Sequence, residues 1–310
     1  MNVLVTGGAG YLGSILSDHL LSAGLSVTVV DNLMYGQSGP YHLAANPRFD
    51  FIFGDARDER IMAGLVKQAD VLIPLAAVVG APSCDRDPVY ATSLNLEAIR
   101  MLNRLRSRSQ RMVFPTTNSG YGTQSGDLFC TEETLLEPIS LYGRLKAQAE
   151  CEILATPNSI TLRLATVFGM SPRMRIDLLV NTFVYEAVKR GYLIIFEKDF
   201  KRNYVHIRDV ADCFLHCIQK GDPMVGQAYN VGLDAANLSK EELAKKVKAY
   251  VPELYLDFAP IGSDPDKRNY IVSNEKLRKA GYEAKRTLDA GIVELIKGYR
   301  MIARSPLSNG

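Results

Sequence analysis

The stretch that decides the fold is VLVTGGAGYLG, residues 3–13. A short apolar run rich in β-branched residues leads into three spaced glycines, and an apolar pattern of helical period follows. This order predicts a strand, a tight turn and a helix. Glycine lets the backbone turn sharply and approach a ligand closely, and the free N–H groups at a helix N-terminus attract a pyrophosphate. We therefore expect these residues to bind a dinucleotide: Gly7, Gly10, Tyr11, Leu12 and Gly13.

The residues after this helix indicate which dinucleotide is bound. Gly24 is placed to end the helix, and residues 27–30 predict a second strand that leads directly to Asp31 and Asn32. A carboxylate at this position accepts hydrogen bonds from both adenosine ribose hydroxyls and repels a 2′-phosphate, which favours NAD over NADP. Three glycines alone also fit an ordinary glycine-rich turn. The strand, the helix and the acid at the expected offsets favour the dinucleotide site, with Asp31 and Asn32 as cofactor ligands.

A tyrosine and a lysine far along the chain predict proton abstraction. Ser140 can cap a helix whose first turn carries Tyr142, and the four-residue step to Lys146 puts both side chains on one face. A phenol is a poor base at neutral pH, but a neighbouring ammonium and the charge of NAD⁺ lower its pKa. Thr117 ends a predicted strand over residues 111–117, at the same sheet edge, where its hydroxyl would hold a substrate alcohol. A tyrosine and a lysine four residues apart on a helix are usually just surface residues. Here the dinucleotide pattern and Thr117 favour a catalytic role for the pair.

Composition agrees with a cytoplasmic enzyme. The chain has 310 residues, of which 47% are apolar, which is ample for a buried core. A net charge of +2 gives no broad surface for nucleic acid, and no stretch is long and apolar enough to cross a membrane. We expect no signal peptide because the first residues already enter a strand. Five cysteines without a CxxC pair suit a reducing compartment, and four histidines without metal spacing predict no metal.

The alternation of strand and helix patterns predicts a Rossmann-type α/β fold, a doubly wound parallel sheet. It runs from residue 1 to about 165 and includes long helices from Pro88 to Ser107 and from Ser140 to Thr156. From about residue 166, loops rich in Gly, Pro and Arg alternate with short helices. We expect an NAD-binding domain over 1–165, completed by parts of 200–235 where residues 204–207 and 228–230 re-enter the sheet. Residues 166–310 mainly form a substrate-binding cap.

The chain resembles the extended short-chain dehydrogenase/reductase family, and within it the NAD-dependent nucleotide-sugar epimerases and dehydratases. The resemblance rests on the glycine spacing and the Tyr-x-x-x-Lys pair, and it covers nearly the whole chain. It implies that Asp55 and Ala56 contact the adenine and that the backbone of Leu75, Ala76 and Ala77 passes under the cofactor. It also implies a homodimer that pairs through the two long helices.

Arginines of the cap suit the diphosphate of a nucleotide-sugar, because forked guanidiniums donate paired hydrogen bonds to phosphates. Arg173 and Arg175 are candidates, although each alone also fits a solvated loop. In the nucleotide-sugar enzymes that this chain resembles, an arginine before a Tyr-x-His stretch, another in a late loop and an asparagine lie at the phosphates. The matching residues here are Arg202, Arg268 and Asn181.

The residues after Thr117 discriminate between reaction classes within the resemblance. The 4,6-dehydratases carry an Asp-Glu pair there, decarboxylating relatives a Glu and 3,5-epimerases a Cys, whereas this chain has Asn118 and Ser119. Oxidation at C4 remains, followed by release of the ketone or by epimerisation. Two departures from the 4-epimerase pattern put simple galactose-type epimerisation in doubt. This chain has Thr166 where 4-epimerases usually carry an asparagine, and Val79 where they usually carry a lysine. Asn118 and Thr166 would then contact the substrate.

Four segments are most similar to a narrower group that includes the GDP-D-glycero-D-manno-heptose 4-dehydrogenase of capsule assembly. These segments are residues 74–82, 117–122, 171–175 and 264–268. We therefore predict NAD-dependent oxidation at C4 of a nucleotide diphosphate-sugar, with a GDP-sugar favoured, in the synthesis of capsule or other surface polysaccharide precursors. A 4-epimerase that uses the same transient 4-keto sugar is the first alternative. A non-catalytic dinucleotide sensor is a remote one, because the proton-transfer residues are all present.

Overall fold

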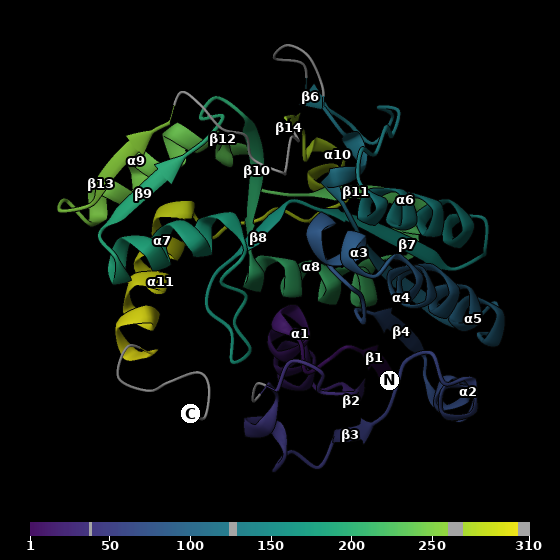
Figure 1. Ribbon diagram of the computed structural model, residues 1–310. Coiled ribbons are helices and arrows are strands. Elements are labelled where there is room, and N and C mark those ends of the chain that lie inside the picture. Colours follow the sequence, from purple (N-terminus) through teal and green to yellow (C-terminus); the bar gives the residue numbers. More distant parts are fainter. Residues whose placement is uncertain (37–38, 124–128, 260–268, 303–310) are drawn as a thin grey trace.

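A parallel sheet runs through the centre of the protein (Figure 1). The computed structural model describes residues 1–36, 39–123, 129–259 and 269–302. Within these residues the central sheet has seven strands in the order β3-β2-β1-β4-β5-β7-β11. Because the strand order reverses beside β1, a crevice opens there at the carboxyl ends of the strands. The strands are β1 Asn2–Thr6, β2 Ser26–Asp31, β3 Phe49–Phe53, β4 Val71–Pro74, β5 Arg111–Thr117, β7 Ser159–Leu164 and β11 Gln227–Val231.

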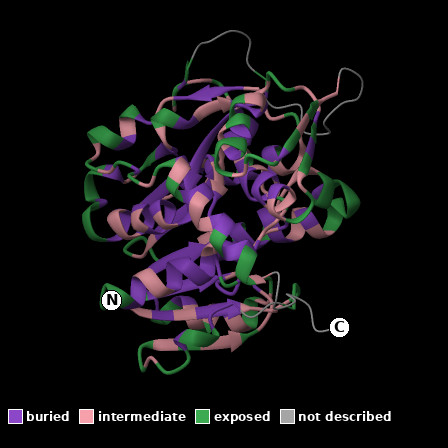
Figure 2. Ribbon diagram, turned by 90° about the vertical axis from the view of Figure 1, so that its left-hand side faces the viewer, coloured by how far each residue is buried: buried purple, intermediate pink, exposed green. Residues whose placement is uncertain are grey.

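Helices cover both faces of the sheet, as parallel strands require. In β1, Val3 and Val5 face one apolar core with helices α1 and α8, while Leu4 faces a second core with α2, α5 and α6. Figure 2 shows the buried residues running through the sheet and the inner helix faces. The bounds of these helices are α1 Tyr11–Ser22, α2 Glu59–Gln68, α5 Ala98–Leu105, α6 Leu141–Leu154 and α8 Ile207–Lys220. The fold is therefore of the predicted class, a doubly wound parallel sheet.

The helix predicted from Pro88 to Ser107 is interrupted. A π-helical turn, η2, separates α4 from α5, and it carries Asn95. The Asn95 amide accepts a hydrogen bond from the Val78 N–H at 2.8 Å and donates one to the Val78 carbonyl at 2.8 Å. Such turns widen a helix locally and occur often at functional sites. This one holds the loop that follows β4. The segments are α4 Pro88–Thr92 and η2 Ser93–Glu97.

The cap contains a separate three-stranded sheet, β12-β10-β8, and the helices α7, α9 and α11. The expectation that residues 204–207 re-enter the main sheet is wrong, because β10 pairs with β8 and β12. β10 cannot pair with β7, which is already flanked by β5 and β11, and it takes β8 and β12 as its partners in the cap. Residues 228–230 do lie in the main sheet. The bounds are β8 Thr166–Phe168, β10 Lys201–His206, β12 Asn237–Ser239, α7 Leu179–Lys189, α9 Lys240–Tyr250 and α11 Leu288–Ile302.

Short elements complete the described chain. Two more strand pairs, β13-β9 and β14-β6, lie in the cap half. In the described part of the chain, no helix combines the length and apolar character needed to cross a bilayer. The remaining bounds are α3 Ala81–Arg86, α10 Glu275–Lys279, β6 Phe129–Cys130, β9 Tyr192–Ile195, β13 Tyr255–Phe258, β14 Ile271–Val272, η1 Tyr41–Leu43, η3 Asn118–Tyr121, η4 Asp222–Met224 and η5 Asp234–Ala236.

Candidate active site

A cavity of about 1020 Å³ lies at the carboxyl ends of the central strands, between the sheet and the cap. It brings together most of the residues that the sequence predicted. The predicted residues on its wall are Gly7, Gly10, Tyr11, Leu12, Gly13, Asp31, Asn32, Asp55, Ala56, Leu75, Ala76, Ala77, Thr117, Tyr142, Lys146, Thr166, Arg173, Arg175 and Arg202.

The glycine turn at one end of the cavity has the shape that a pyrophosphate requires. Gly7 has a φ of +71° and donates its N–H to the Val30 carbonyl at 2.8 Å, and a Cβ there would lie 2.5 Å from the Ala76 nitrogen. A Cβ on Gly13 would lie 2.6 Å from the Gly7 carbonyl oxygen. Gly10 precedes α1, whose N-terminus has no side-chain cap among the described residues and no acid in its first turn. The positive end of α1 therefore faces the cavity with no acid in its own first turn to neutralise it.

Two carboxylates line the cavity beyond β2 and β3, on the side predicted to hold the adenosine. Asp31 at the end of β2 accepts the N–H of Ala9 at 3.0 Å on one oxygen and the N–H of Leu33 at 2.8 Å on the other. Each carboxylate oxygen has a further lone pair that a ribose hydroxyl can use. Asp55 is held by Arg57 through a 2.6 Å ion pair, and this hydrogen bond lowers the pKa of Asp55. Both acids thus occupy the positions that the sequence predicted, with fixed orientations.

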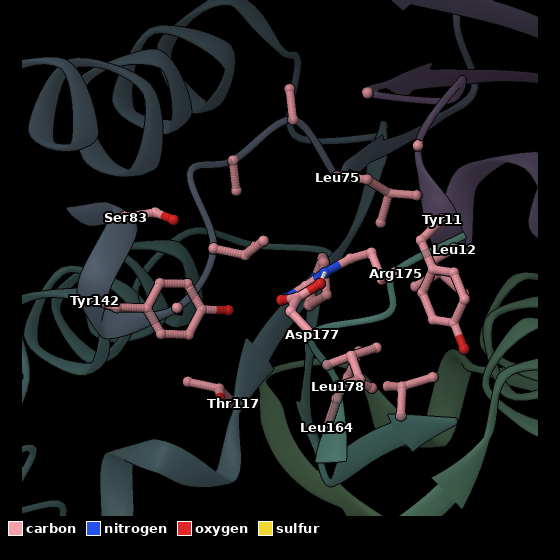
Figure 3. Close-up of a pocket in the computed structure, with 18 of the residues that line it drawn as sticks. Tyr11, Leu12, Leu75, Ser83, Thr117, Tyr142, Leu164, Arg175, Asp177 and Leu178 are labelled. Atoms are coloured by element: carbon pink, nitrogen blue, oxygen red, sulfur yellow. Dashed lines mark hydrogen bonds and ion pairs between the residues drawn. The ribbon is translucent and has the colours of Figure 1, made fainter. Parts of the chain in front are cut away.

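The predicted catalytic residues converge on the other side of the same cavity. Helix α6 begins where the Ser140 hydroxyl accepts the N–H of Gly143 at 3.1 Å. Figure 3 shows the Tyr142 hydroxyl pointing into the cavity from this helix, with Thr117 nearby at the end of β5. Lys146 lies one turn further along α6 and also reaches the cavity wall. The structure thus brings the three predicted catalytic residues together on one cavity wall, and their catalytic roles stay a prediction.

Lys146 is a buried cation. Its side chain is only 3% exposed, and the ammonium donates to the Pro115 carbonyl at 3.1 Å and lies 4.5 Å from the centre of the Phe114 ring. Burial lowers the pKa of Lys146 to about 8. At pH 7 roughly ten ammonium forms exist for each neutral amine, so the positive charge is present there but is lost as pH rises above 8.

Hydroxyl groups line the wall beside Tyr142. The Thr117 hydroxyl donates to the Ser119 hydroxyl at 2.8 Å and accepts the Ser119 N–H at 3.1 Å. Ser83, from α3, also lies near Tyr142 (Figure 3). Sequence reasoning did not identify Ser83 or Ser119 as wall residues. A serine carries no local signal that separates a ligand contact from an ordinary turn residue.

The cap side of the cavity carries two buried cations from separate elements. Arg202 of β10 lines the wall, and its guanidinium lies 5.7 Å from the centre of the Tyr270 ring. Lys240, the first residue of α9, also lines the wall and donates to the Phe196 carbonyl at 3.0 Å. Sequence reasoning missed Lys240 because a lysine in a helix first turn usually indicates a solvated surface. Arg268, the other predicted diphosphate ligand, lies outside the described residues.

The two arginines of the segment after β8 lie in different surroundings. Arg175 forms an ion pair with Asp177, and Figure 3 shows this pair in the middle of the cavity. The Arg173 guanidinium instead stacks 4.2 Å from the centre of the Tyr35 ring, beyond the end of β2. The two side chains therefore serve different parts of the cavity.

Comparison with known proteins identifies the family. Residues 3–232 match the NAD dependent epimerase/dehydratase family. The chain belongs to this family. It is 27% identical to a low-salt glycan biosynthesis protein of Haloferax volcanii, over 96% of this chain and 98% of that protein. It is 28% identical to UDP-arabinose 4-epimerase 1 of Arabidopsis thaliana, over 86% and 73% of the two chains. The solved UDP-glucose 4-epimerase of Thermotoga maritima, with UDP-glucose, is similar with a TM-score of 0.84 and 26% identity, over 98% and 100%.

These matches confirm the Rossmann-type fold, the enzyme class and NAD as the cofactor of this epimerase/dehydratase family member. The structure agrees independently, because the Gly7 turn, the uncapped N-terminus of α1 and the Asp31 carboxylate fit a dinucleotide. The narrower similarity to GDP-heptose 4-dehydrogenases stays a prediction.

Two residues that the sequence predicted to bind substrate, Asn118 and Asn181, are not on the cavity wall. Asn118 is fully buried, and its amide has no hydrogen-bond partner among the described residues. Asn181 is also fully buried and donates to the Tyr11 hydroxyl at 3.1 Å and to the Arg175 carbonyl at 2.9 Å. Neither side chain is on the cavity wall, so direct substrate contact by Asn118 and Asn181 stays a prediction. Asn181 instead supports residues that do line the wall.

A buried polar network fixes the catalytic helix to the sheet. Glu150 of α6 accepts hydrogen bonds from the Thr116 hydroxyl at 2.8 Å and from Arg163 of β7 at 2.7 Å. Arg163 also donates to the Tyr121 hydroxyl at 3.0 Å. The Glu150 and Arg163 side chains are almost completely buried. Because this network joins α6 to β5 and β7, it holds Tyr142 in register with Thr117.

Proposed function

We propose that this protein oxidises C4 of the sugar in a nucleotide diphosphate-sugar. One observation carries the proposal: the Tyr142 hydroxyl, the Thr117 hydroxyl and the buried Lys146 ammonium meet at one cavity with the dinucleotide turn. This arrangement suits proton abstraction from an alcohol next to a nucleotide cofactor. Bound NAD⁺ would supply the hydride acceptor.

Each residue has a distinct task in the proposed reaction. Tyr142, as phenolate, accepts the proton of the C4 hydroxyl while the C4–H bond breaks and a carbonyl forms at C4. Thr117 exchanges its hydrogen bond to Ser119 for one to the C4 oxygen, which orients the hydroxyl. Lys146 carries its charge on the buried side of the wall, where it stabilises the phenolate.

The substrate diphosphate is proposed to lie at the cap side of the cavity. Arg202 and Lys240 bring two positive charges to this wall, and paired donors suit phosphate oxygens. The sequence similarity noted above favours a GDP-sugar, most like a GDP-heptose, and a role in capsule or surface polysaccharide precursor synthesis. We also propose a cytoplasmic homodimer, by the same resemblance.

A C4 epimerase is the second candidate. The relatives named above include a UDP-arabinose 4-epimerase and a UDP-glucose 4-epimerase, and the first chemical step is common to both reactions. Against it, Val79 and Thr166 line the cavity where galactose-type epimerases carry a lysine and an asparagine. The two outcomes differ in products: a dehydrogenase accumulates keto sugar with NADH, and an epimerase returns a C4 epimer without net NADH.

Incubation with GDP-, UDP- and CDP-sugars, followed by mass spectrometry and by NADH absorbance, tests the proposal. Tyr142→Phe should lower turnover by at least about 100-fold, the usual contribution of a general base, while NADH still binds. Tyr250→Phe makes the same chemical change on the cap surface, where Tyr250 bonds Asp289, and should leave turnover unchanged. Turnover by Tyr142→Phe within about threefold of wild type would remove Tyr142 from the proposed role.

A further inference from the structure

Arg173 brings a buried positive charge to the cofactor half of the cavity. Its side chain is 9% exposed and lines the wall together with Asp31 and Tyr35. Among the described residues no carboxylate pairs with its guanidinium, and its buried Nε has no hydrogen-bond partner. Burying a cation without a paired anion is strongly unfavourable. Arg173 therefore lies in a position that an anionic ligand would complete.

The segment that carries Arg173 is attached to the start of α1. We call residues 169–177 the strap. The Ser171 hydroxyl donates to the Tyr11 carbonyl at 2.7 Å, and the Tyr11 hydroxyl donates to the Gly169 carbonyl at 2.7 Å. Tyr11 is the first residue of α1, and two residues of chain span at most about 7 Å. The strap thus places the Arg173 backbone close to the N-terminus of α1.

Two positive features then face the same part of the cavity from opposite structural halves. The N-terminus of α1 comes from the dinucleotide-binding half, and Arg173 comes from the cap half. The charges that act on Arg173 are repulsion by Arg175 and attraction by Asp177 and Asp31. Asp177 is already paired with Arg175, and Asp31 already accepts two backbone N–H groups. A ligand group with about two negative charges and several acceptor oxygens fits this region, as a diphosphate does.

The neighbouring residues indicate whether Arg173 faces the pyrophosphate of NAD or the diphosphate of the substrate. Asp31 would bind the adenosine ribose, and the pyrophosphate is the next group along a dinucleotide. Arg202 and Lys240, from β10 and α9, line the cap side of the cavity, where the diphosphate of the substrate is proposed to lie. We propose that Arg173 binds the pyrophosphate of NAD from the cap side, opposite α1, and does not serve the substrate diphosphate as the sequence predicted. Tyr35 holds the guanidinium plane in place by stacking.

This assignment makes the strap a part of the cofactor site. Because one cofactor contacts both halves through α1 and Arg173, cofactor binding and docking of the strap reinforce each other. The assignment depends on the NAD site alone and holds for either proposed outcome at C4. Its test therefore needs neither a sugar nor turnover, and its failure would leave the proposed reaction untouched.

The experiment measures equilibrium dissociation constants for NADH, ADP-ribose, GDP and UDP by calorimetry. Arg173→Gln should weaken NADH and ADP-ribose roughly 10- to 100-fold, as expected for the loss of charge-assisted hydrogen bonds, and should change GDP and UDP by less than about threefold. Arg202→Gln should show the opposite pattern. Arg190→Gln, an exposed residue paired with Glu186 on α7, is the matched control and should change none of the four.

Arg173→Lys is a second variant that keeps the assignment testable if Arg173→Gln does not fold. It keeps the positive charge but loses the forked donor and the planar stack on Tyr35. It should weaken NADH and ADP-ribose less than the Gln variant does, at unchanged melting temperature. Loss of GDP or UDP binding alone, equal loss for all four ligands, or no loss for any of them overturns the assignment. A loss confined to NADH and ADP-ribose supports it.

Discussion

Replacing Lys146 with methionine should stabilise the cofactor-free protein near neutral pH while it removes catalytic activity. The ammonium is almost completely buried, and its described contacts are a carbonyl dipole and an aromatic ring rather than a carboxylate. Methionine has a similar length and no charge, so it keeps the packing and removes the buried ion. Activity should fall because the proposed phenolate at Tyr142 loses its nearby positive charge.

The magnitude follows from the pKa of Lys146. Burial lowers this pKa from 10.5 to about 8, a difference of about 2.5. One pKa unit corresponds to about 1.4 kcal/mol, so keeping Lys146 protonated in the folded state costs about 3 kcal/mol at pH 7. The variant leaves the Pro115 carbonyl without its donor, which costs about 1–3 kcal/mol. The net gain in the free energy of unfolding should be about 1 kcal/mol at pH 7.

The pH dependence is the sharper test, because the cost at Pro115 does not change with pH. Below about pH 8, Lys146 is protonated in both the folded and the unfolded chain, and the full cost of the buried charge applies. Between about pH 8 and 10.5, the unfolded chain binds a proton that the folded chain has released, so wild-type stability rises with pH. The methionine variant lacks this rise. Its advantage should therefore shrink by about 2 kcal/mol between about pH 7 and pH 9.5.

Urea unfolding followed by circular dichroism measures both proteins at the two pH values. Urea is uncharged and leaves the electrostatic contribution unscreened. The matched control is Lys245→Met on the exposed face of α9, where the same change removes a charge that solvent already hydrates. A stability difference between Lys146→Met and wild type that is the same at both pH values would refute the reasoning.

Further variants test the turn and the network under the site. Gly7→Ala should abolish NADH binding in a fluorescence titration, because the added Cβ would lie 2.5 Å from the Ala76 nitrogen at a φ of +71°; wild-type affinity would contradict this. Glu150→Gln should lower the free energy of unfolding by about 3–5 kcal/mol, because it leaves Arg163 charged and buried. Glu152→Gln removes a partly exposed surface pair and should cost less than about 1 kcal/mol, and equal losses for the two variants would contradict the importance of burial.

The dinucleotide turn and the catalytic helix could be predicted from the sequence because their physics is local. A φ of +71° is open to Gly7 because it has no Cβ, and the start of α1 is uncapped because Gly10 has no side chain. Ser140 caps α6 through a residue three positions away, and the same helix sets the step from Tyr142 to Lys146. Patterns of this kind remain visible without knowledge of distant contacts.

The π turn η2 and the separate sheet of the cap could not be predicted in this way. The turn depends on Asn95 bonding both backbone groups of Val78, which come from the loop after β4. The place of β10 depends on its pairing with β8 and β12, which lie more than 30 residues before and after it in the chain. Each is settled by competition for hydrogen-bond partners among segments that are distant in sequence.

The sequence by itself determined the class of fold, the dinucleotide turn and the three residues proposed to move the proton, because these follow from backbone freedom and helical spacing. Tertiary structure alone decided which partner each of these polar side chains contacts. It placed Arg173 on Tyr35, Lys240 on the cavity wall and Asn181 against Tyr11. The reason is that a polar side chain has many possible partners, and only the packing of the whole chain selects one.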